Sequence, residues 1–263
     1  MHSRVPTPAA IAQAALDIAK HTIPYNQVRP VNFIHLMEHN HGTAREVDAH
    51  GLSRKNPLIV ACGDSVTAGW FEGNTLFPEA LHQAFFKDTP AVEHVTDIGN
   101  VYHELFKLML SERYERTSVS VINSGISGDN VVGILTRLAR DVLRYDPDLV
   151  LLNACLNGPE DLVQYESSLR DIAQRLQRGT HADIVFITPN MVREQTKGTL
   201  DERVGILLSV ADEFGFCVAD TYATWHTIAA GGIDISSLLA NELNHPTVTG
   251  HQLYAMEIMK LLS

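Results

Sequence analysis

Five short apolar runs are spread along the chain, and each is followed by glycine or small polar residues. Runs of four to six residues that are rich in Val, Ile and Leu are typical of strands buried on both faces. We therefore predict five buried β-strands, over residues 58–62, 118–122, 149–153, 183–188 and 216–219.

Between these runs, apolar residues recur every three or four positions, which is the spacing of an amphipathic helix. Gly179 and Gly215 follow two of the stripes, where a helix C-cap is expected, and residues 250–262 read as a closing helix. Strands that alternate with helices predict an α/β fold with a parallel sheet covered on both faces. The three stripes are Val131, Leu135, Leu138 and Val142; Leu162, Leu169, Ile172 and Leu176; and Val204, Leu207, Ala211 and Phe214.

Two parts of the chain exceed this minimal pattern. Residues 1–57 contain a helix start, with Thr7 as N-cap and Pro8 at the first helical position. Residues 71–117 are long for one crossover and are expected to contain helices around 77–86 and 98–114. We predict one domain over residues 58–263 with an insertion at about 71–117, preceded by an extension that packs on its core.

Charge and composition exclude several classes of protein. The formal net charge of −11 would repel polyanions, so no nucleic-acid partner is expected. We expect no membrane partner, because the sequence lacks the roughly 18 consecutive apolar residues that span a bilayer. Within residues 11–20, Gln13, Asp17 and Lys20 interrupt the apolar positions. A signal peptide has a continuous apolar run instead, so we expect a cytoplasmic location.

The three cysteines, Cys62, Cys155 and Cys217, all lie in or beside apolar runs. Their number is odd and no C-x-x-C pair occurs, so we predict reduced cysteines buried in the core.

Ser65 follows the first predicted strand, within the segment Gly63-Asp64-Ser65-Val66-Thr67-Ala68-Gly69. At the carboxyl edge of a parallel sheet its hydroxyl would face the site where such sheets bind ligands. Asp64 and Ser65 also suit a simple helix cap, so this segment alone does not make Ser65 a nucleophile.

Small polar residues also follow the second and third strands. Gly125 and Gly128 lie after the second strand and suit either close approach to a ligand or an ordinary turn. Asn157 lies after the third strand, where its amide could donate to an oxyanion or form a turn.

His245 precedes a proline and the last helix, so we predict that it lies on a loop. A serine hydroxyl needs a neighbouring base near pH 7, and histidine has a suitable pKa. Among 13 histidines, His245 by itself could equally be a surface residue.

Taken together, these segments resemble the SGNH, or GDSL, hydrolase family over about residues 58–262. The resemblance implies a three-layer α/β/α sandwich with a five-stranded parallel sheet. It implies that Ser65 is the nucleophile, that His245 is the base, and that the Ser65 N–H, the Gly128 N–H and the Asn157 side chain form the oxyanion hole. The matching blocks, in chain order, are Gly63-Asp64-Ser65, Gly128, Asn157 and His245-Pro246.

Two departures from the family pattern stand out. The third block is usually Gly-x-Asn-Asp, whereas here it reads Cys155-Leu156-Asn157-Gly158, so the first glycine and the aspartate are missing. The family usually places Asp three residues before the catalytic histidine, and this chain has Glu242 there. We expect Glu242 to orient His245, with Asn241, Asp220, Asp234 or a backbone carbonyl as alternatives.

The resulting hypothesis is a serine esterase that forms an acyl-enzyme on small-molecule esters, preferably short-chain or acetyl esters such as acetylated carbohydrates, without cofactor or metal. An acyltransferase with the same site is an alternative, because an acceptor other than water would complete the same reaction. A non-catalytic module that binds phosphate or flavin is a second alternative, although it gives His245 no role. A metal site on His35, His39, His41 and His50, or on His245 and His251, lacks the spacing of a known ligand set.

Overall fold

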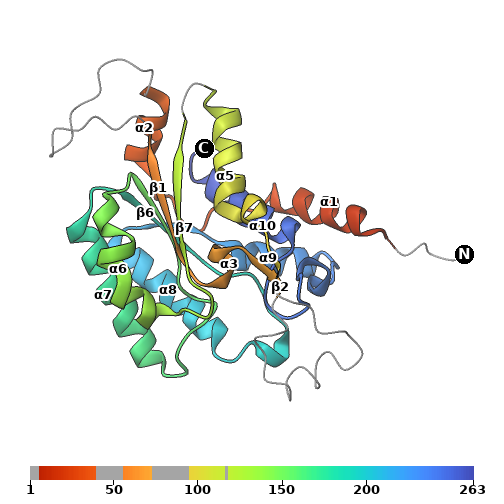
Figure 1. Cartoon of the computed structure of the whole chain (residues 1–263). Coiled ribbons are helices and arrows are strands. Elements are labelled where there is room, and N and C mark those ends of the chain that lie inside the picture. Colours follow the sequence, from red (N-terminus) through yellow and green to blue (C-terminus); the bar gives the residue numbers. More distant parts are fainter. Residues whose placement is uncertain (1–5, 40–55, 73–94, 116–117) are drawn as a thin grey trace, which may run out of the picture.

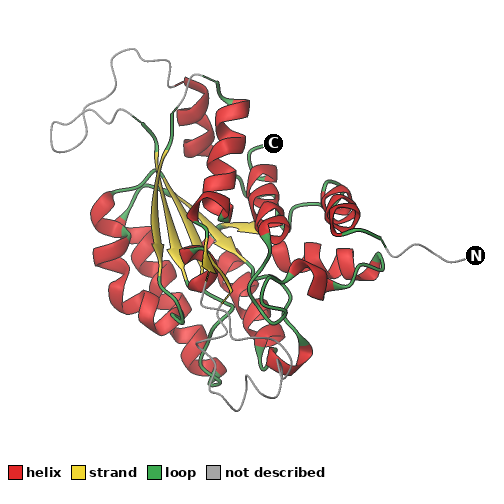
Figure 2. Ribbon diagram, turned by 45° about the vertical axis from the view of Figure 1, so that its right-hand side comes forward, coloured by secondary structure: helices red, strands yellow, loops and turns green. Residues whose placement is uncertain are grey.

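The computed structural model describes residues 6–39, 56–72, 95–115 and 118–263. Its central feature is a sheet of five parallel strands in the order β4-β1-β5-β6-β7 (Figure 2). This is the strand order 2-1-3-4-5 of flavodoxin-like folds, in which ligands bind beyond the carboxyl ends of the strands. The strands are β1 Leu58–Gly63, β4 Ser120–Gly125, β5 Leu149–Asn153, β6 Asp183–Ile187 and β7 Cys217–Ala219.

Helices cover both faces of the sheet and make three layers, which confirms the predicted α/β/α architecture (Figure 1). One face carries α6 Val131–Asp141, α7 Leu162–Gly179 and α8 Leu200–Phe214. The other face carries α5 Tyr102–Arg113 and α10 Val248–Lys260, which pack against each other. The strands β1 and β5 lie in the middle of the sheet and are almost completely buried, as their continuous apolar sequence predicts.

The predicted element boundaries hold to within a few residues. Helix α8 ends at Gly215, whose φ of +68° gives the expected left-handed C-cap. Helix α7 instead continues through Gly179 and is capped by Thr180. The short elements that complete the fold are α3 Ser65–Ala68, α9 Thr221–Ala230 and the 3₁₀ helices Ile98–Asn100, Leu143–Tyr145, Glu194–Thr196 and Ile235–Leu238.

The N-terminal extension begins with α1 Pro8–Ala19, which is capped by Thr7 as predicted and packs against α9 and α10. An ion pair within α10 also contacts the end of α1 and helps to hold it in place. Lys260 Nζ lies 2.5 Å from Glu257 Oε1 and donates to the Ala19 carbonyl at 2.7 Å. Helix α2 Val31–His39 follows and packs against β6.

The long insertion is described only at its two ends. Strands β2 Trp70–Glu72 and β3 Val95–Thr96 pair antiparallel, and the predicted second helix is α5. The helix expected around 77–86 lies outside the described residues. Within the described part of the chain, no helix is long and apolar enough to cross a membrane.

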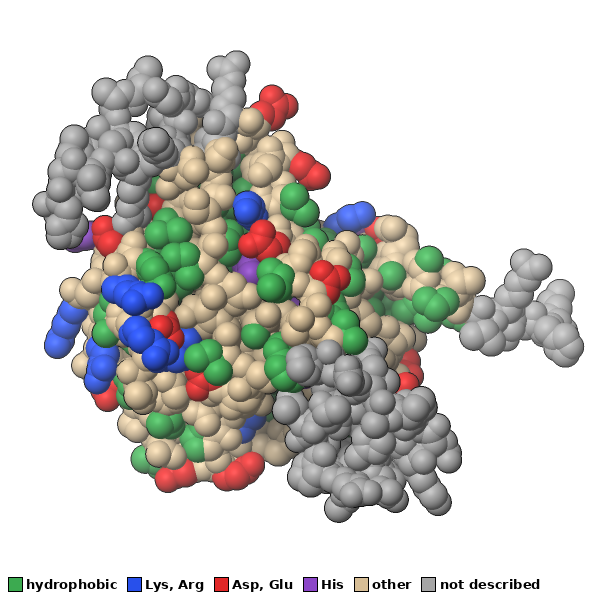
Figure 3. Space-filling model, viewed as in Figure 1, with side chains coloured by type: hydrophobic (Ala, Val, Ile, Leu, Met, Phe, Trp, Pro, Cys, Tyr) green, Lys and Arg blue, Asp and Glu red, His purple; other side chains and the backbone are tan. Residues whose placement is uncertain are grey.

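Basic side chains gather at one edge of the face shown in Figure 3, over α6 and its surroundings. They are interspersed with carboxylates. Arg140, whose side chain is two-thirds exposed, lies 2.5 Å from Asp141 Oδ1. The charge of this edge is therefore partly neutralised.

Candidate active site

Ser65 is the first residue of α3, two residues after the end of β1, and the structure brings it to His245. Its Oγ atom lies 2.9 Å from His245 Nε2, and the two residues are only 4% and 5% exposed. They are 180 positions apart in the sequence. A hydroxyl within hydrogen-bond distance of an imidazole is the geometry that general-base activation of a nucleophile requires.

Asp64 provides the helix cap that the sequence allowed, which leaves the Ser65 hydroxyl available to His245. The Asp64 Oδ1 atom accepts a hydrogen bond from the Val66 N–H at 2.9 Å. Asp64 is 2% exposed, and burial raises the pKa of its carboxyl to about 7. Asp64 therefore makes the helix cap, and the Ser65 hydroxyl contacts His245.

Two glycines allow the backbone to pack closely around this turn. A Cβ atom on Gly63 would lie 2.2 Å from Thr67 Oγ1 and 2.7 Å from the Asn153 carbonyl oxygen. A Cβ atom on Gly125 would lie 2.2 Å from the Ala68 nitrogen. The ends of β1 and β4 thus hold α3 in place only because neither residue has a side chain.

His245 lies in a loop whose backbone is held by hydrogen bonds to one side chain, that of Asn241. Asn241 Oδ1 accepts hydrogen bonds from three successive N–H groups, and the bond from the His245 N–H measures 2.9 Å. The loop is closed by a β-bridge between Leu239 and Pro246. Burial lowers the pKa of His245 to about 4, so its ring is neutral at pH 7 and can accept a proton.

Glu242 does not reach His245, in contrast to the expected contact. Its side chain is 66% exposed and points toward Arg193, with 3.8 Å between the charged atoms. The physical reason is local: Glu242 has a left-handed φ of +58°, and the turn that Asn241 caps directs its side chain outward. Among the described residues, His245 Nδ1 is buried without a hydrogen-bond partner.

The side chains that were alternative partners for His245 make other contacts. Asp220 caps α9 through the Ala223 N–H and accepts a hydrogen bond from Thr188 Oγ1 at 2.8 Å. Asp234 caps the 3₁₀ helix Ile235–Leu238. Asn241 uses its side-chain oxygen on the backbone of its own loop.

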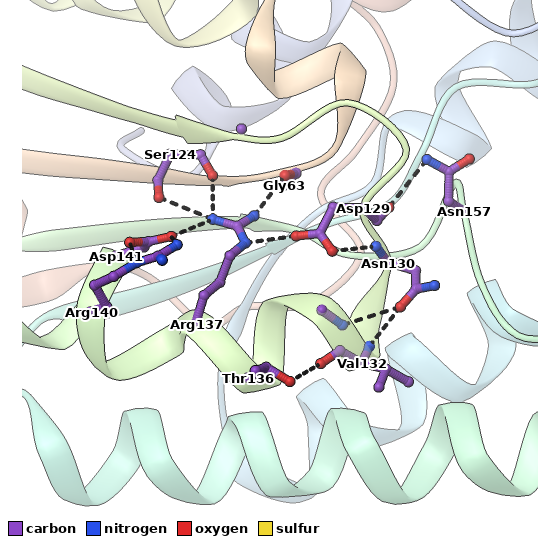
Figure 4. A network of polar contacts seen from close by, with 12 residues as sticks. Gly63, Ser124, Asp129, Asn130, Val132, Thr136, Arg137, Arg140, Asp141 and Asn157 are labelled. Atoms are coloured by element: carbon purple, nitrogen blue, oxygen red, sulfur yellow. Dashed lines mark hydrogen bonds and ion pairs between the residues drawn. The ribbon is translucent and has the colours of Figure 1, made fainter. Parts of the chain in front are cut away.

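The loops that carry Gly128 and Asn157 lie against each other (Figure 4). The Asn157 Nδ2 atom donates a hydrogen bond to the Asp129 carbonyl at 3.2 Å. Gly128 has a φ of +73°, and no described atom lies within 4 Å of the position of its Cβ. The hydrogen bond to Asp129, the residue after Gly128, therefore connects the loops of two residues that are predicted to form the oxyanion hole. The Cβ position of Gly128 faces open space.

Arg137 holds the strand ends behind these loops, a role that the sequence pattern did not predict. It lies on α6 and is 7% exposed. Its guanidinium donates to the Gly63 carbonyl at 2.9 Å, to the Ser124 carbonyl at 2.7 Å and to Asp129 Oδ2 at 2.6 Å (Figure 4). The sequence signal was an arginine beside an apolar stripe, which usually indicates an exposed position.

Other candidate nucleophiles and ligands do not form a second centre in the described residues. Cys62, Cys155 and Cys217 are free and buried, as predicted, and burial raises the pKa of each thiol to about 12. No group of three His, Cys, Asp or Glu side chains in the described residues could hold a metal ion. His41 and His50 lie outside the described residues.

Comparisons with known proteins identify the family of the chain. A profile of the GDSL-like Lipase/Acylhydrolase family matches residues 61–253. An acetylxylan esterase of Geobacillus stearothermophilus is 24% identical over 183 residues, which are 62% of this chain and 81% of that protein.

Solved structures show the same fold. A structure of an acetylxylan esterase from Geobacillus stearothermophilus has a TM-score of 0.60 at 21% identity, over 79% of this chain and 94% of the other. An α/β hydrolase enzyme from the metagenome of Lake Arreo has a TM-score of 0.59 at 19% identity, over 78% and 94%. With the matched profile spanning most of the chain, from β1 into α10, the protein belongs to the GDSL-like lipase/acylhydrolase family and is a carboxylic ester hydrolase.

Proposed function

We propose that this chain hydrolyses short-chain esters, and acetyl esters of carbohydrates in particular, through an acyl-enzyme on Ser65. The observation that carries the proposal is the 2.9 Å distance between Ser65 Oγ and His245 Nε2 at the carboxyl edge of the sheet. The alternative of a non-catalytic phosphate-binding or flavin-binding module gives this pair no purpose.

The reaction proceeds in two steps. As Ser65 Oγ attacks the ester carbonyl, His245 Nε2 takes the hydroxyl proton, and the ester alcohol leaves after it receives that proton. Water then attacks the acyl-enzyme, His245 accepts a proton from the water, and the acid is released as the Ser65 hydroxyl is restored. The neutral His245 ring at pH 7 suits the first step.

The developing oxyanion needs hydrogen-bond donors on the side of the carbonyl away from His245. We assign this role to the backbone N–H groups of Ser65 and Gly128 and to Asn157 Nδ2. The Ser65 N–H lies at the start of α3, and the first N–H groups of a helix have no partner within it. Asn157 uses one amide hydrogen on the Asp129 carbonyl, and in this assignment the second amide hydrogen is the one that binds the oxyanion.

The choice of substrate follows from the relatives. The similar proteins from Geobacillus stearothermophilus are described as acetylxylan and acetyl-xylooligosaccharide esterases. Variants of that esterase described as catalytic mutants replace a serine, an aspartate and a histidine, with the aspartate three positions before the histidine. Here Glu242 occupies that position and faces solvent, so we propose a Ser65–His245 pair as the minimal catalytic unit.

The test compares the wild-type chain with S65A on p-nitrophenyl acetate and on acetylated xylooligosaccharides. We expect kcat to fall by a factor on the order of a million in S65A. A fluorophosphonate probe should label wild type and not S65A. The matched control is S167A, an exposed serine on α7, which should keep full activity.

Undiminished hydrolysis by S65A would refute the nucleophile assignment. Measuring free acetate against transferred ester in the presence of sugar alcohols separates the esterase from an acyltransferase. We expect free acetate as the main product.

A further inference from the structure

Arg203 on α8 is a second buried arginine, and it binds the loop that leads to Asn157. The side chain is 5% exposed. Its Nε atom donates to the Cys155 carbonyl at 3.1 Å, and its Nη2 atom donates to the Leu156 carbonyl at 3.1 Å. These two carbonyls belong to the two residues directly before Asn157.

Gly158, the residue after Asn157, packs closely against the same arginine. A Cβ atom on Gly158 would lie 2.5 Å from Arg203 Cδ and 2.8 Å from its Nε. The φ of Gly158 is outside the left-handed region, so the close approach of Arg203, rather than the backbone conformation, requires glycine here. Arg203 therefore contacts the loop on both sides of Asn157.

The chemistry of these contacts favours a rigid loop. The guanidinium is planar, and its donors point in fixed directions, so two hydrogen bonds to successive carbonyls fix the orientation of the peptide planes. A third bond, from Nη1 to Thr199 Oγ1 at 2.8 Å, ties the guanidinium to the residue before α8. All three acceptors are neutral oxygen atoms, so none of these contacts is an ion pair. The fixed directions of the N–H donors determine the geometry.

Arg203 thus differs from Arg137, which binds the carboxylates of Asp129 and Asp141. Asn157 is held from two directions. Arg203 fixes the backbone before it, and the Asp129 carbonyl accepts from its side chain at 3.2 Å.

We propose that Arg203 is a positioning residue, which keeps Asn157 Nδ2 directed at the oxyanion. This inference rests on the proposed function, because it assigns no role to Arg203 other than through Asn157. Without the two bonds, the loop can rotate and the amide can move by about 1 Å, a displacement that can cost on the order of a hundredfold in rate.

The experiment measures kcat and KM on p-nitrophenyl acetate for R203M and R203K, each made in the wild-type chain and in N157A. We expect R203M to lower kcat about 10- to 100-fold with KM changed less than about threefold, because the oxyanion exists only in the transition state. R203K keeps the charge but not the paired donors, so kcat should recover only in part. In the N157A background, R203M should change kcat by less than about threefold.

The control is R170M, which removes a partly exposed arginine of α7 that pairs with Glu166. It should leave kcat unchanged. Thermal unfolding of each variant shows whether it is folded. If R203M does not fold, the G158A variant tests the inference instead. Its added Cβ displaces the Arg203 side chain and should lower kcat in the same way.

An unchanged kcat in folded R203M, or an equal loss of kcat in both backgrounds, would overturn the inference. An N157A variant with wild-type kcat would also overturn it, because the route through Asn157 would be gone. Those failures leave the proposed function standing as long as S65A is inactive, whereas an active S65A would remove the proposed function itself.

Discussion

His245 presents one ring nitrogen to Ser65, with 2.9 Å between Nε2 and Oγ, while its other nitrogen, Nδ1, is buried and has no hydrogen-bond partner among the described residues. In the proposed mechanism Nε2 accepts the serine proton, so the neutral ring carries its hydrogen on Nδ1. No carboxylate in the described residues stabilises the imidazolium that forms, and burial disfavours it. The ring is therefore a weak base that stays neutral over a wide pH range.

The first prediction concerns the pH dependence of activity. The His245 ring accepts a proton only while neutral, and its pKa is lowered by burial to about 4, so kcat/KM should stay level from pH 7 to pH 5 and fall to half near pH 4. The measurement uses an uncharged ester between pH 3.5 and pH 8, with circular dichroism as a check on folding. H226A, which removes an exposed histidine of α9, should show the same profile. A midpoint at 6.5 or above would mean that a carboxylate reaches the ring in the working enzyme.

The second prediction concerns Glu242. Because its side chain is 66% exposed and lies 3.8 Å from Arg193, we expect E242Q to keep kcat/KM within about threefold of wild type. H245A should instead lose a factor on the order of a million in kcat. Steady-state kinetics on the two variants makes the comparison. A loss of a thousandfold or more in E242Q would show that Glu242 swings toward His245 during the reaction.

The parts of the fold and site that the sequence predicts are those set by local pattern. The continuous apolar runs predict β1 and β5 because strands buried on both faces have no polar positions. Ser65, Gly128 and Asn157 each follow one of the first three predicted strands, so the rule that ligands bind at the carboxyl ends places them at one edge of the sheet. In the structure these three strands are neighbours.

The parts that the sequence does not predict depend on contacts between distant residues. An arginine beside an apolar stripe looks exposed, so the sequence did not assign Arg137 or Arg203 to the backbone carbonyls that they bind. Gly63 lies 74 positions from Arg137, and Leu156 lies 47 positions from Arg203. Glu242 stands at the right spacing from His245, but its left-handed φ turns the side chain away. Spacing alone carries no information on that angle.

The third prediction concerns the close packing of β4 on α3. In G125A the new Cβ would lie 2.2 Å from the Ala68 nitrogen, so α3 or the strand must move. We expect a loss of about 1–3 kcal/mol in the free energy of unfolding and, since Ser65 moves with α3, at least about a hundredfold lower kcat. Urea unfolding and steady-state kinetics measure the two effects.

The matched control for this prediction is G205A. No described atom lies within 4 Å of a Cβ on Gly205, which lies in the middle of α8. Replacing an interior helical glycine with alanine should raise stability by about 0.5–1 kcal/mol without changing kcat. If G125A is as stable and active as G205A, the packing of β4 on α3 does not hold the nucleophile in place.

The fourth prediction concerns Asp64. Burial raises the pKa of its carboxyl from 3.8 in the unfolded chain to about 7, so between these values the folded chain binds the additional proton. The contribution of this group to stability is full below about pH 4 and is lost as the pH rises through 7. In D64N the side-chain oxygen still accepts the Val66 N–H, and no charge needs to be buried. We therefore expect wild type to lose stability relative to D64N, by on the order of a few kcal/mol, as the pH rises from 4 to 8.

Urea unfolding of both proteins at several pH values gives this difference directly, because all other titrating groups are common to the two. D161N is the matched control, since Asp161 caps α7 in the same way but is exposed. D161N therefore measures the loss of a capping carboxylate that is not buried. A D64N difference that is level from pH 4 to pH 8 would show that Asp64 has the same proton affinity in the folded and unfolded chain, and that the carboxylate beside the nucleophile is charged whenever the enzyme works.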